Sequence, residues 1–319
     1  MRRWLGHIIQ HSGAALGLGG ICLVLTIVAP GFADPANIQM VLRQISFNTV
    51  LAVGMTFVIL TAGIDLSVGS VLGLAECVLA WVMVKADLAA PAQVPAGMLA
   101  GLTVGAFCGL VNGFLVTAVR VPPFIATLGL MSAARGMALV ITGGFSISPL
   151  PSAFKFFGQG MLLGWIPVPA LIAGAVAAVG WVILRYTPSG RYVYAIGGNE
   201  EAARLSGVPV ARCKLGVYTF CGLLAGLTGL LLGARLGSAR PTDGLGYELD
   251  AIAAVVIGGT SLMGGKGSVG QSVIGAAIMG VLRNGLVLLD VSAFWQQVII
   301  GAVIVLAVAA DALKSRGPT

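Results

Sequence analysis

The sequence predicts an all-α polytopic membrane protein, and three observations support that prediction. Hydrophobic residues make up 58% of the 319 positions, against roughly 45–50% in soluble domains. Only 9% of the residues are charged, and the mean hydropathy is +1.01. Apolar runs close to the ~18–20 residues that cross a bilayer recur along almost the whole chain. No soluble-domain-sized insertion separates them, so we expect one membrane domain over residues 1–319.

The apolar runs predict about ten transmembrane helices, some of them short or broken. The predicted spans are residues 13–30, 49–62, 68–84, 94–119, 124–141, 168–184, 215–233, 251–263, 270–289 and 293–310. The second is short for a crossing unless residues 45–48 also lie in the membrane, and residues 37–48 form a polar approach to it. The N-terminus superficially resembles a signal peptide, but further spans follow, so we expect an uncleaved first span.

Glycine recurs every four residues in the fourth predicted span. Small residues at that spacing let helix backbones approach closely. We therefore expect this span to pack tightly on a neighbouring helix. The glycines are Gly97, Gly101, Gly105, Gly109 and Gly113.

Two breaks interrupt the apolar pattern. One places Asp65 and Ser67 between two apolar runs with no room for a loop, and the other is Gly264-Gly265-Lys266-Gly267. Backbone broken at membrane depth is tolerated only where protein or a water-filled cavity covers it. Asp65 or Ser67 can cap the next helix, or the breaks can line a gate, and both can hold. The candidate path or gate residues are Asn48, Asp65, Ser67, Arg135, Thr260, Ser268 and Asn284.

Arg135 is a special case among these candidates because it lies well inside a predicted span. An intramembrane arginine must meet a counter-charge, a carbonyl or water. We therefore expect its guanidinium to contact one of these groups.

Residues 185–214 are rich in charge, with seven charged residues in thirty. They contain a complete short helix signal: Asn199 can cap, Glu200 and Glu201 suit the first turn, and Arg204 suits the last. Gly207 can end the helix. A helix of about two turns is too short to be stable alone, so we expect it to pack on another protein. The alternative is a solvated loop whose basic residues hold it on one side of the membrane.

Ten spans place both termini on the same side. Eleven of the eighteen Lys and Arg residues then lie on that side, five lie on the other and two lie within spans. Cytoplasmic loops carry the excess of basic residues, so we expect cytoplasmic termini. Residues 185–214 would then be cytoplasmic, and residues 143–167 and 235–250 would face outward.

Several function classes are excluded. The net charge of +7 is dispersed between spans, which serves topology rather than nucleic-acid binding. The five cysteines form no CxxC pair, so neither a disulfide framework nor a metal site is predicted. No GxxxxGK[ST] phosphate loop occurs, and the two histidines precede the first span. We expect no catalytic residue and no cofactor bound by this chain.

Three stretches resemble one family: residues 54–70, 190–208 and 247–268. They are similar to the membrane permeases of bacterial ATP-binding cassette (ABC) sugar importers of the ribose type, within the branched-chain amino acid/ribose permease superfamily. The similarity extends from about residue 37 to residue 311. It implies a type II-like ABC importer permease, homodimeric, in the bacterial inner membrane.

The resemblance also implies partners. They are a cytoplasmic ATPase that holds ATP and Mg²⁺, and a periplasmic sugar-binding protein that delivers the substrate. The short charged helix would then be the element coupled to the ATPase. The residues that the resemblance places in it are Asn199, Glu200, Glu201, Arg204, Leu205 and Gly207. Two departures from the ribose permease pattern, Arg283 and the loop at residues 143–165, leave ribose, another pentose or a hexose open.

The outward-facing charges Arg235, Arg240, Asp243 and Glu248 are candidates for docking the binding protein, since charged rims set encounter rate and register. The alternative is that they cap helices and pair with one another.

A rival function is a secondary transporter, which would place carboxylates near the midplane of the membrane. Glu76 is the only acid well inside a predicted span. A permease for another small solute, such as a branched-chain amino acid, is a further alternative.

Overall fold

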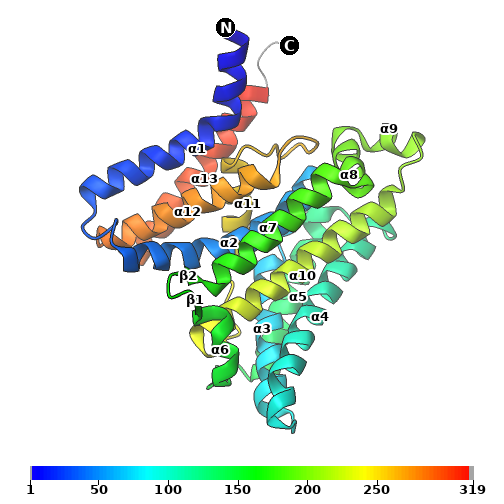
Figure 1. The fold of residues 1–319 in the computed structure, drawn as a ribbon. Coiled ribbons are helices and arrows are strands. Elements are labelled where there is room, and N and C mark those ends of the chain that lie inside the picture. The colour runs from blue at the N-terminus through cyan, green and yellow to red at the C-terminus, as the bar shows by residue number, and fades with distance from the viewer. Residues whose placement is uncertain (1, 316–319) are drawn as a thin grey trace.

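The computed structural model describes residues 2–315, with side chains over residues 13–306 and 308–309, and within this range it is mostly helical (Figure 1). The long helices are α1 (Arg2–Val28), α2 (Pro35–Leu60), α3 (Val68–Lys85), α4 (Ala90–Thr117), α5 (Pro123–Thr142), α7 (Val168–Tyr186), α10 (Val210–Leu236), α12 (Val269–Leu288) and α13 (Ala293–Ser315). The shorter helices are α6 (Ser152–Gln159), α8 (Pro188–Gly198), α9 (Glu200–Leu205) and α11 (Tyr247–Ile257). The strands β1 (Met161–Leu162) and β2 (Ile166–Pro167) form an antiparallel hairpin.

Each of the ten predicted spans corresponds to a helix, and the all-α polytopic class is confirmed. Seven helices of the described part are long and apolar enough to cross a membrane: α2, α3, α4, α5, α7, α10 and α12. Within the described side chains, α1 and α13 contribute the further apolar segments Gly13–Val28 and Ala293–Leu306. The chain is a multi-pass membrane protein.

Two predicted boundaries were wrong. Residues 37–48 are not an approach but the first half of α2, which begins at Pro35 and is continuous to Leu60. The predicted span 251–263 ends early, because α11 stops at Ile257 and Gly259 adopts a φ of +103°. The backbone from residue 258 to residue 268 is therefore a loop rather than a span.

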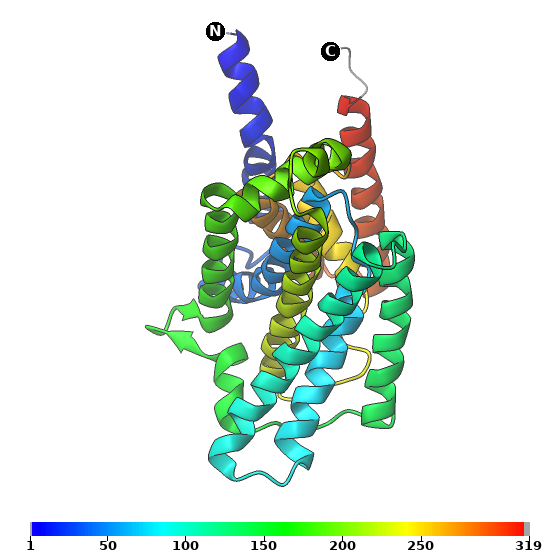
Figure 2. The same ribbon diagram turned by 90° about the vertical axis from the view of Figure 1, so that its right-hand side faces the viewer.

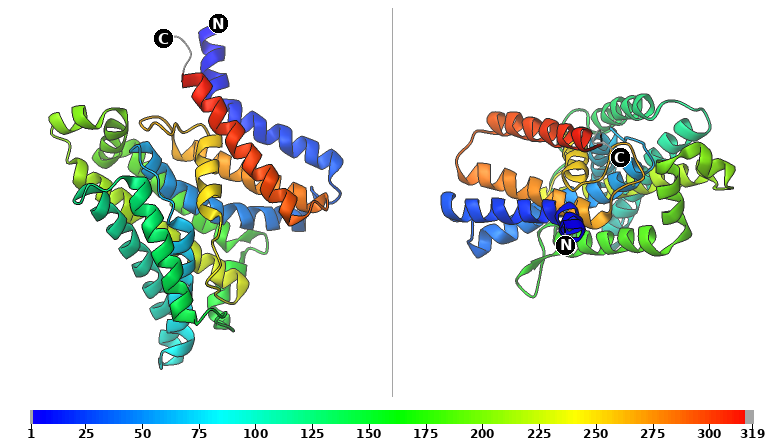
Figure 3. Two further views of the ribbon diagram at one scale, coloured as in Figure 1. Left: turned by 180° about the vertical axis from the view of Figure 1, so that it is seen from behind. Right: turned by 90° about the horizontal axis from the view of Figure 1, so that it is seen from above.

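The core is organised around α2, whose residues from Ser46 to Leu60 are all buried. Helices α7, α10, α11 and α12 all pack on α2, while α3 packs on α4, α5 and α10. At one edge, α1 packs on α12 (Figures 2 and 3). Helix α2 is thus the most enclosed of the seven helices that can cross a membrane.

The glycine stripe of α4 is a packing surface, as predicted. A Cβ atom at Gly101 would lie 3.2 Å from the Ala75 carbonyl oxygen of α3, and one at Gly105 would lie 2.4 Å from the Gly222 carbonyl oxygen of α10. A Cβ atom at Gly109 would lie 2.2 Å from the Tyr218 carbonyl oxygen. Because no side chain intervenes, the α4 and α10 backbones are in direct contact.

The bundle has two distinct ends. The start of α1, the end of α13 and the helices α8 and α9 lie at one end, which we call the α9 side (Figures 1 and 2). The turn between α3 and α4 and helix α6 lie at the other, the α6 side. The placement of both ends of the chain on one side agrees with an even number of crossings.

Candidate functional site

The charged stretch at residues 185–214 is mostly helical, with α8 followed directly by α9. The predicted caps of α9 are present: Asn199 Oδ1 accepts a hydrogen bond from the Ala202 N–H at 2.9 Å, and Gly207 adopts a φ of +84°. Helix α8 was not predicted, although Thr187 and Pro188 form a start signal. The Thr187 hydroxyl accepts a hydrogen bond from the Gly190 N–H at 3.3 Å, and Pro188 occupies the first helical turn, where no N–H is needed.

Helix α9 is held by ion pairs and presents an apolar residue. Glu200 pairs with Lys214 of α10, and Glu201 pairs with Arg204. The hydrogen bond that Arg204 donates to the Glu201 carboxylate raises the pKa of Arg204 above its ordinary value. Within α9 only Ala203 is buried, whereas Leu205 is 80% exposed. Leu205 is thus an exposed apolar side chain at the end of a helix whose charged residues are paired.

Helix α8 packs directly on the end of α2, just before the first break, and on the second break. The Gly265 N–H donates to the Leu60 carbonyl oxygen at 3.0 Å, which joins the second break to the end of α2. A Cβ atom at Gly197 of α8 would lie 1.8 Å from that same oxygen and 2.4 Å from the Gly265 nitrogen. We call this contact of α8 with the end of α2 and the second break the α8 junction.

Tyr194 adds a side-chain bond to the junction. Its hydroxyl donates to the Gly267 carbonyl oxygen at 2.8 Å. Burial raises the pKa of Tyr194 above its ordinary value, so the phenol keeps the proton that this bond requires. Two breaks about 200 residues apart in the chain and the base of the charged stretch therefore meet at one place.

The first break is closed by a small buried network. Asp65 Oδ1 accepts hydrogen bonds from the Ser67 N–H at 2.9 Å and from the Ser67 hydroxyl at 2.6 Å. Asn112 of α4 donates to Ser67 Oγ at 2.9 Å. Ser67 stands at the N-cap of α3 without a side-chain cap bond, so Asp65 is the residue that satisfies the backbone. Asn112 was missed; an amide within an otherwise apolar span was the available signal.

The second break lies between α11 and α12. Ser268 caps α12 by accepting a hydrogen bond from the Gln271 N–H at 3.3 Å. Thr260 is fully buried against Gly267, where a Cβ atom would lie 2.3 Å from the Thr260 hydroxyl oxygen. A cleft of about 390 Å³ opens beside this break, between α7, α8 and α12. Its lining comprises Trp181, Leu184, Arg185, Tyr194, Gly267, Ser268 and Val269.

The remaining path candidates lie elsewhere. Arg135 is near the α6 side, where its Nη1 donates to the carbonyl oxygens of Pro241 and Asp243, the latter at 2.9 Å. The expectation that this arginine meets a carbonyl is confirmed. Asn284 of α12 exchanges side-chain hydrogen bonds with Asn37 of α2 at 2.8 and 3.1 Å, and Asn48 is buried on α2. The seven candidates therefore do not form one continuous row in this structure.

The residues predicted to dock the binding protein are largely engaged within the chain. Arg240 pairs with Asp243 at 3.1 Å, with side chains 52% and 10% exposed. Glu248 accepts a hydrogen bond from the Gly246 N–H at 3.3 Å, and the Arg235 guanidinium lies 5.4 Å from the centre of the Phe47 ring. Arg240 is thus the one member of this set with a mostly exposed charge.

Arg283 also finds its partner inside the bundle. Its guanidinium lies 3.0 Å from the Asp250 carboxylate, with side chains 31% and 7% exposed. The unexpected positive charge of α12 therefore compensates the acid in the first turn of α11.

Comparison with known proteins identifies the family. The model for the family described as branched-chain amino acid transport system / permease component matches residues 37–308. The ribose import permease protein RbsC of Bacillus subtilis (strain 168) is 47% identical, over 97% of this chain and 94% of that protein. Its Escherichia coli (strain K12) counterpart is 47% identical over 96% and 95%.

A xylose transport system permease protein, XylH of Escherichia coli (strain K12), is 37% identical over 93% of this chain and 90% of that protein. No solved structure matches. The resemblance seen in the three sequence stretches is confirmed. The chain belongs to the family of branched-chain amino acid transport system permease components, and it is a membrane-embedded transport subunit of an ABC system.

Proposed function

We propose that this chain forms the translocation path of an ABC importer for a monosaccharide, either ribose or a related pentose or hexose. The identity of 47% to ribose import permeases over nearly the whole chain carries this proposal. A periplasmic binding protein delivers the sugar. ATP and Mg²⁺ are bound by a separate ATPase, since this chain has no phosphate loop. Two copies of the chain form the permease in the bacterial inner membrane.

The rival functions have less support. Glu76, the acid that a secondary transporter could use, is fully buried, and it lines neither of the two clefts beside α7. A branched-chain amino acid substrate is suggested by the family's description. The near-full-length relatives named above are sugar permeases, which favours a sugar.

The α9 side faces the cytoplasm in this proposal, together with both termini. Helix α9 and its caps contact the ATPase in this proposal. The coupling residues are Asn199, Glu200, Glu201, Arg204, Leu205 and Gly207. Helix α8 follows its movement because the two helices are joined directly at Asn199. The α8 junction then transmits that movement to the breaks, because at Gly197 the backbone of α8 contacts the backbone of the end of α2 and of the second break without an intervening side chain.

The path candidates divide by position. We assign Asp65, Ser67, Thr260 and Ser268 to the gate at the breaks, and we assign Asn48, Arg135 and Asn284 to holding the helices around it. The cleft beside the second break combines the indole of Trp181, the phenol of Tyr194 and the hydroxyl of Ser268. Arg185 adds a guanidinium to this mixed lining. Aromatic faces beside a few polar groups are typical of a small-molecule site, so we infer that the sugar leaves through this cleft.

Docking of the binding protein is proposed for the surface around Arg240. Three further residues do not contact the binding protein in this proposal but hold the segment that carries Arg240 in place: Asp243, Glu248 and Arg235. Arg135 holds the same segment through the carbonyl groups of Pro241 and Asp243.

Uptake in proteoliposomes containing the permease, the ATPase and the loaded binding protein should require ATP. Depletion of ATP should abolish uptake of labelled ribose, and an ionophore should leave it unchanged. The measurement is the initial rate of uptake, with xylose as the parallel substrate. Uptake that survives ATP depletion and collapses with the ionophore would establish the secondary transporter instead.

Leu205→Asp should release the ATPase, because it places a charge where an exposed apolar side chain is proposed to be buried on binding. The measurement is the amount of ATPase that co-purifies with the tagged permease. Leu163→Asp is the matched control, since Leu163 is 86% exposed in the hairpin between β1 and β2. Equal retention of the ATPase by both variants would remove α9 as the contact.

Gly197→Ala should uncouple ATP hydrolysis from transport. The added Cβ would meet the Leu60 oxygen and the Gly265 nitrogen, and such overpacking costs about 1–3 kcal/mol. Gly198→Ala is the matched control because nothing lies within 4 Å of its Cβ. Hydrolysis and uptake are measured together in the assembled importer. A Gly197→Ala permease that transports as well per ATP as the Gly198→Ala control contradicts transmission through the junction.

Arg240→Ala should slow capture of the loaded binding protein, and the defect should shrink as salt rises. Exposed charges are screened beyond roughly 8–10 Å at physiological ionic strength. Association rates are measured on reconstituted permease at two salt concentrations. Lys85→Ala, which removes an exposed charge at the end of α3, serves as the control. A defect that does not vary with salt counts against docking at this surface.

A further inference from the structure

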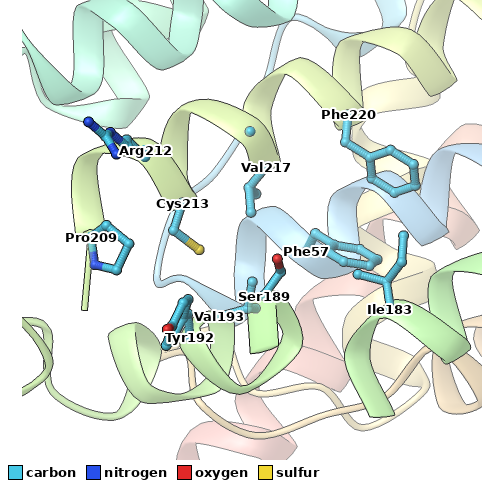
Figure 4. Close-up of a pocket in the computed structure, with 11 residues that line it drawn as sticks. Phe57, Ile183, Ser189, Tyr192, Val193, Pro209, Arg212, Cys213, Val217 and Phe220 are labelled. Carbon is cyan, nitrogen blue, oxygen red and sulfur yellow. The ribbon is translucent and has the colours of Figure 1, made fainter. Parts of the chain in front are cut away.

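We propose that the cleft between α7, α8 and α10 binds an acidic phospholipid, with an acyl chain inside the cleft and the phosphate near Arg212. The cleft has a volume of about 380 Å³ (Figure 4). It lies on the opposite side of α7 from the cleft at the second break: one is lined by Ile183, the other by Trp181, Leu184 and Arg185. Four steps support this assignment.

The first step is the architecture of the cleft. Helices α7 and α10 both pack on α2, and α8 packs on both of them. The space between α7 and α10 is therefore closed behind by Phe57 of α2 and covered at the α9 side by Ser189, Tyr192 and Val193 of α8. The two helices that form its walls, α7 and α10, are both long and apolar enough to cross a membrane.

The second step is the separation of charge and apolar surface along the cleft. Arg212 and Pro209 lie at one end, where α10 begins, while Phe57, Ile183 and Phe220 gather at the other (Figure 4). Eight residues of helix separate Arg212 from Phe220, which is about 12 Å at 1.5 Å per residue. A cation at the membrane surface above an apolar interior matches the order of groups in a phospholipid.

The third step is the level of the cleft in the membrane. Trp181 and Tyr186 of α7 form an edge-to-face pair at 5.2 Å between ring centres, and both are exposed. Tryptophan and tyrosine gather where the membrane meets water. The end of α7 that carries them also provides Ile183 to the apolar end of the cleft, so the cleft lies near the membrane surface and Arg212 lies on its water side.

The fourth step is the charge of the occupant. No acidic residue lines the cleft, and Arg212 is absent from the ion pairs of the described side chains. Besides Arg212, the cleft has few polar groups in its lining: Ser189, Tyr192 and Cys213. A sugar would leave most of its hydroxyl groups without partners there. A basic residue between transmembrane helices on the cytoplasmic side is typical of acidic headgroup sites.

The occupant would contact α8 and α10 at once. Its assignment to the cytoplasmic leaflet rests on the orientation given under the proposed function. Lipid binding itself depends on neither transport nor the ATPase, so the two proposals fail separately.

The test titrates the delipidated, purified full-length permease with phosphatidylglycerol or phosphatidylcholine of identical acyl chains, and native mass spectrometry counts bound lipid. Arg212→Gln should lower the preference for phosphatidylglycerol about fivefold, the contribution of one basic residue near an acidic lipid. Arg191→Gln, an exposed arginine of α8 outside the cleft lining, is its control and should keep the preference.

Gly216→Leu should abolish binding of both lipids at this site. Gly216 lines the cleft, and nothing lies within 4 Å of a Cβ atom there, so the leucine fills the cleft without meeting backbone. Gly174→Leu of α7, with equally open surroundings and outside the cleft lining, should bind as the parent does. Unchanged binding by Gly216→Leu, equal losses in Arg212→Gln and Arg191→Gln, or displacement of lipid by ribose would each overturn the proposal.

Discussion

Inside a membrane, a backbone N–H or C=O group that leaves a helix must find its partner within the protein, and this requirement shapes the whole α9 side. The end of α2 and the loop before α12 satisfy each other through the bond between Gly265 and Leu60. Tyr194 satisfies Gly267 from α8. These bonds form only because Gly197 lacks a side chain where the three segments meet. The segment proposed to follow the ATPase is therefore the segment on which the breaks depend.

Charges within the bundle obey the same requirement. Arg135 uses two carbonyl oxygens of the segment that carries Arg240, and Asp250 is compensated by Arg283. A buried charge that loses its partner is costly, so each of these contacts holds two elements together. Arg135 and Asn284, two of the predicted path residues, therefore also hold neighbouring segments together.

The two clefts beside α7 differ in chemistry although α8 covers both. One has an indole, a phenol and a serine hydroxyl next to the second break. The other is apolar, with Arg212 at its end. A displacement of α8 would change both clefts together. The same movement proposed to open the exit for sugar would therefore alter the contacts of a lipid bound on the opposite side of α7.

The sequence by itself determined the all-α polytopic class, the tight face of α4, and the caps of α9 at Asn199 and Gly207. These features are local, because hydropathy, four-residue spacing and capping depend on neighbouring residues. Only the tertiary structure decided that residues 37–48 are helical, that α8 forms despite its glycines, and that the two breaks meet. Those outcomes depend on partners distant in the chain, such as Asn284 for Asn37 and Leu60 for Gly265. No local pattern encodes a contact whose geometry exists only once the helices have packed.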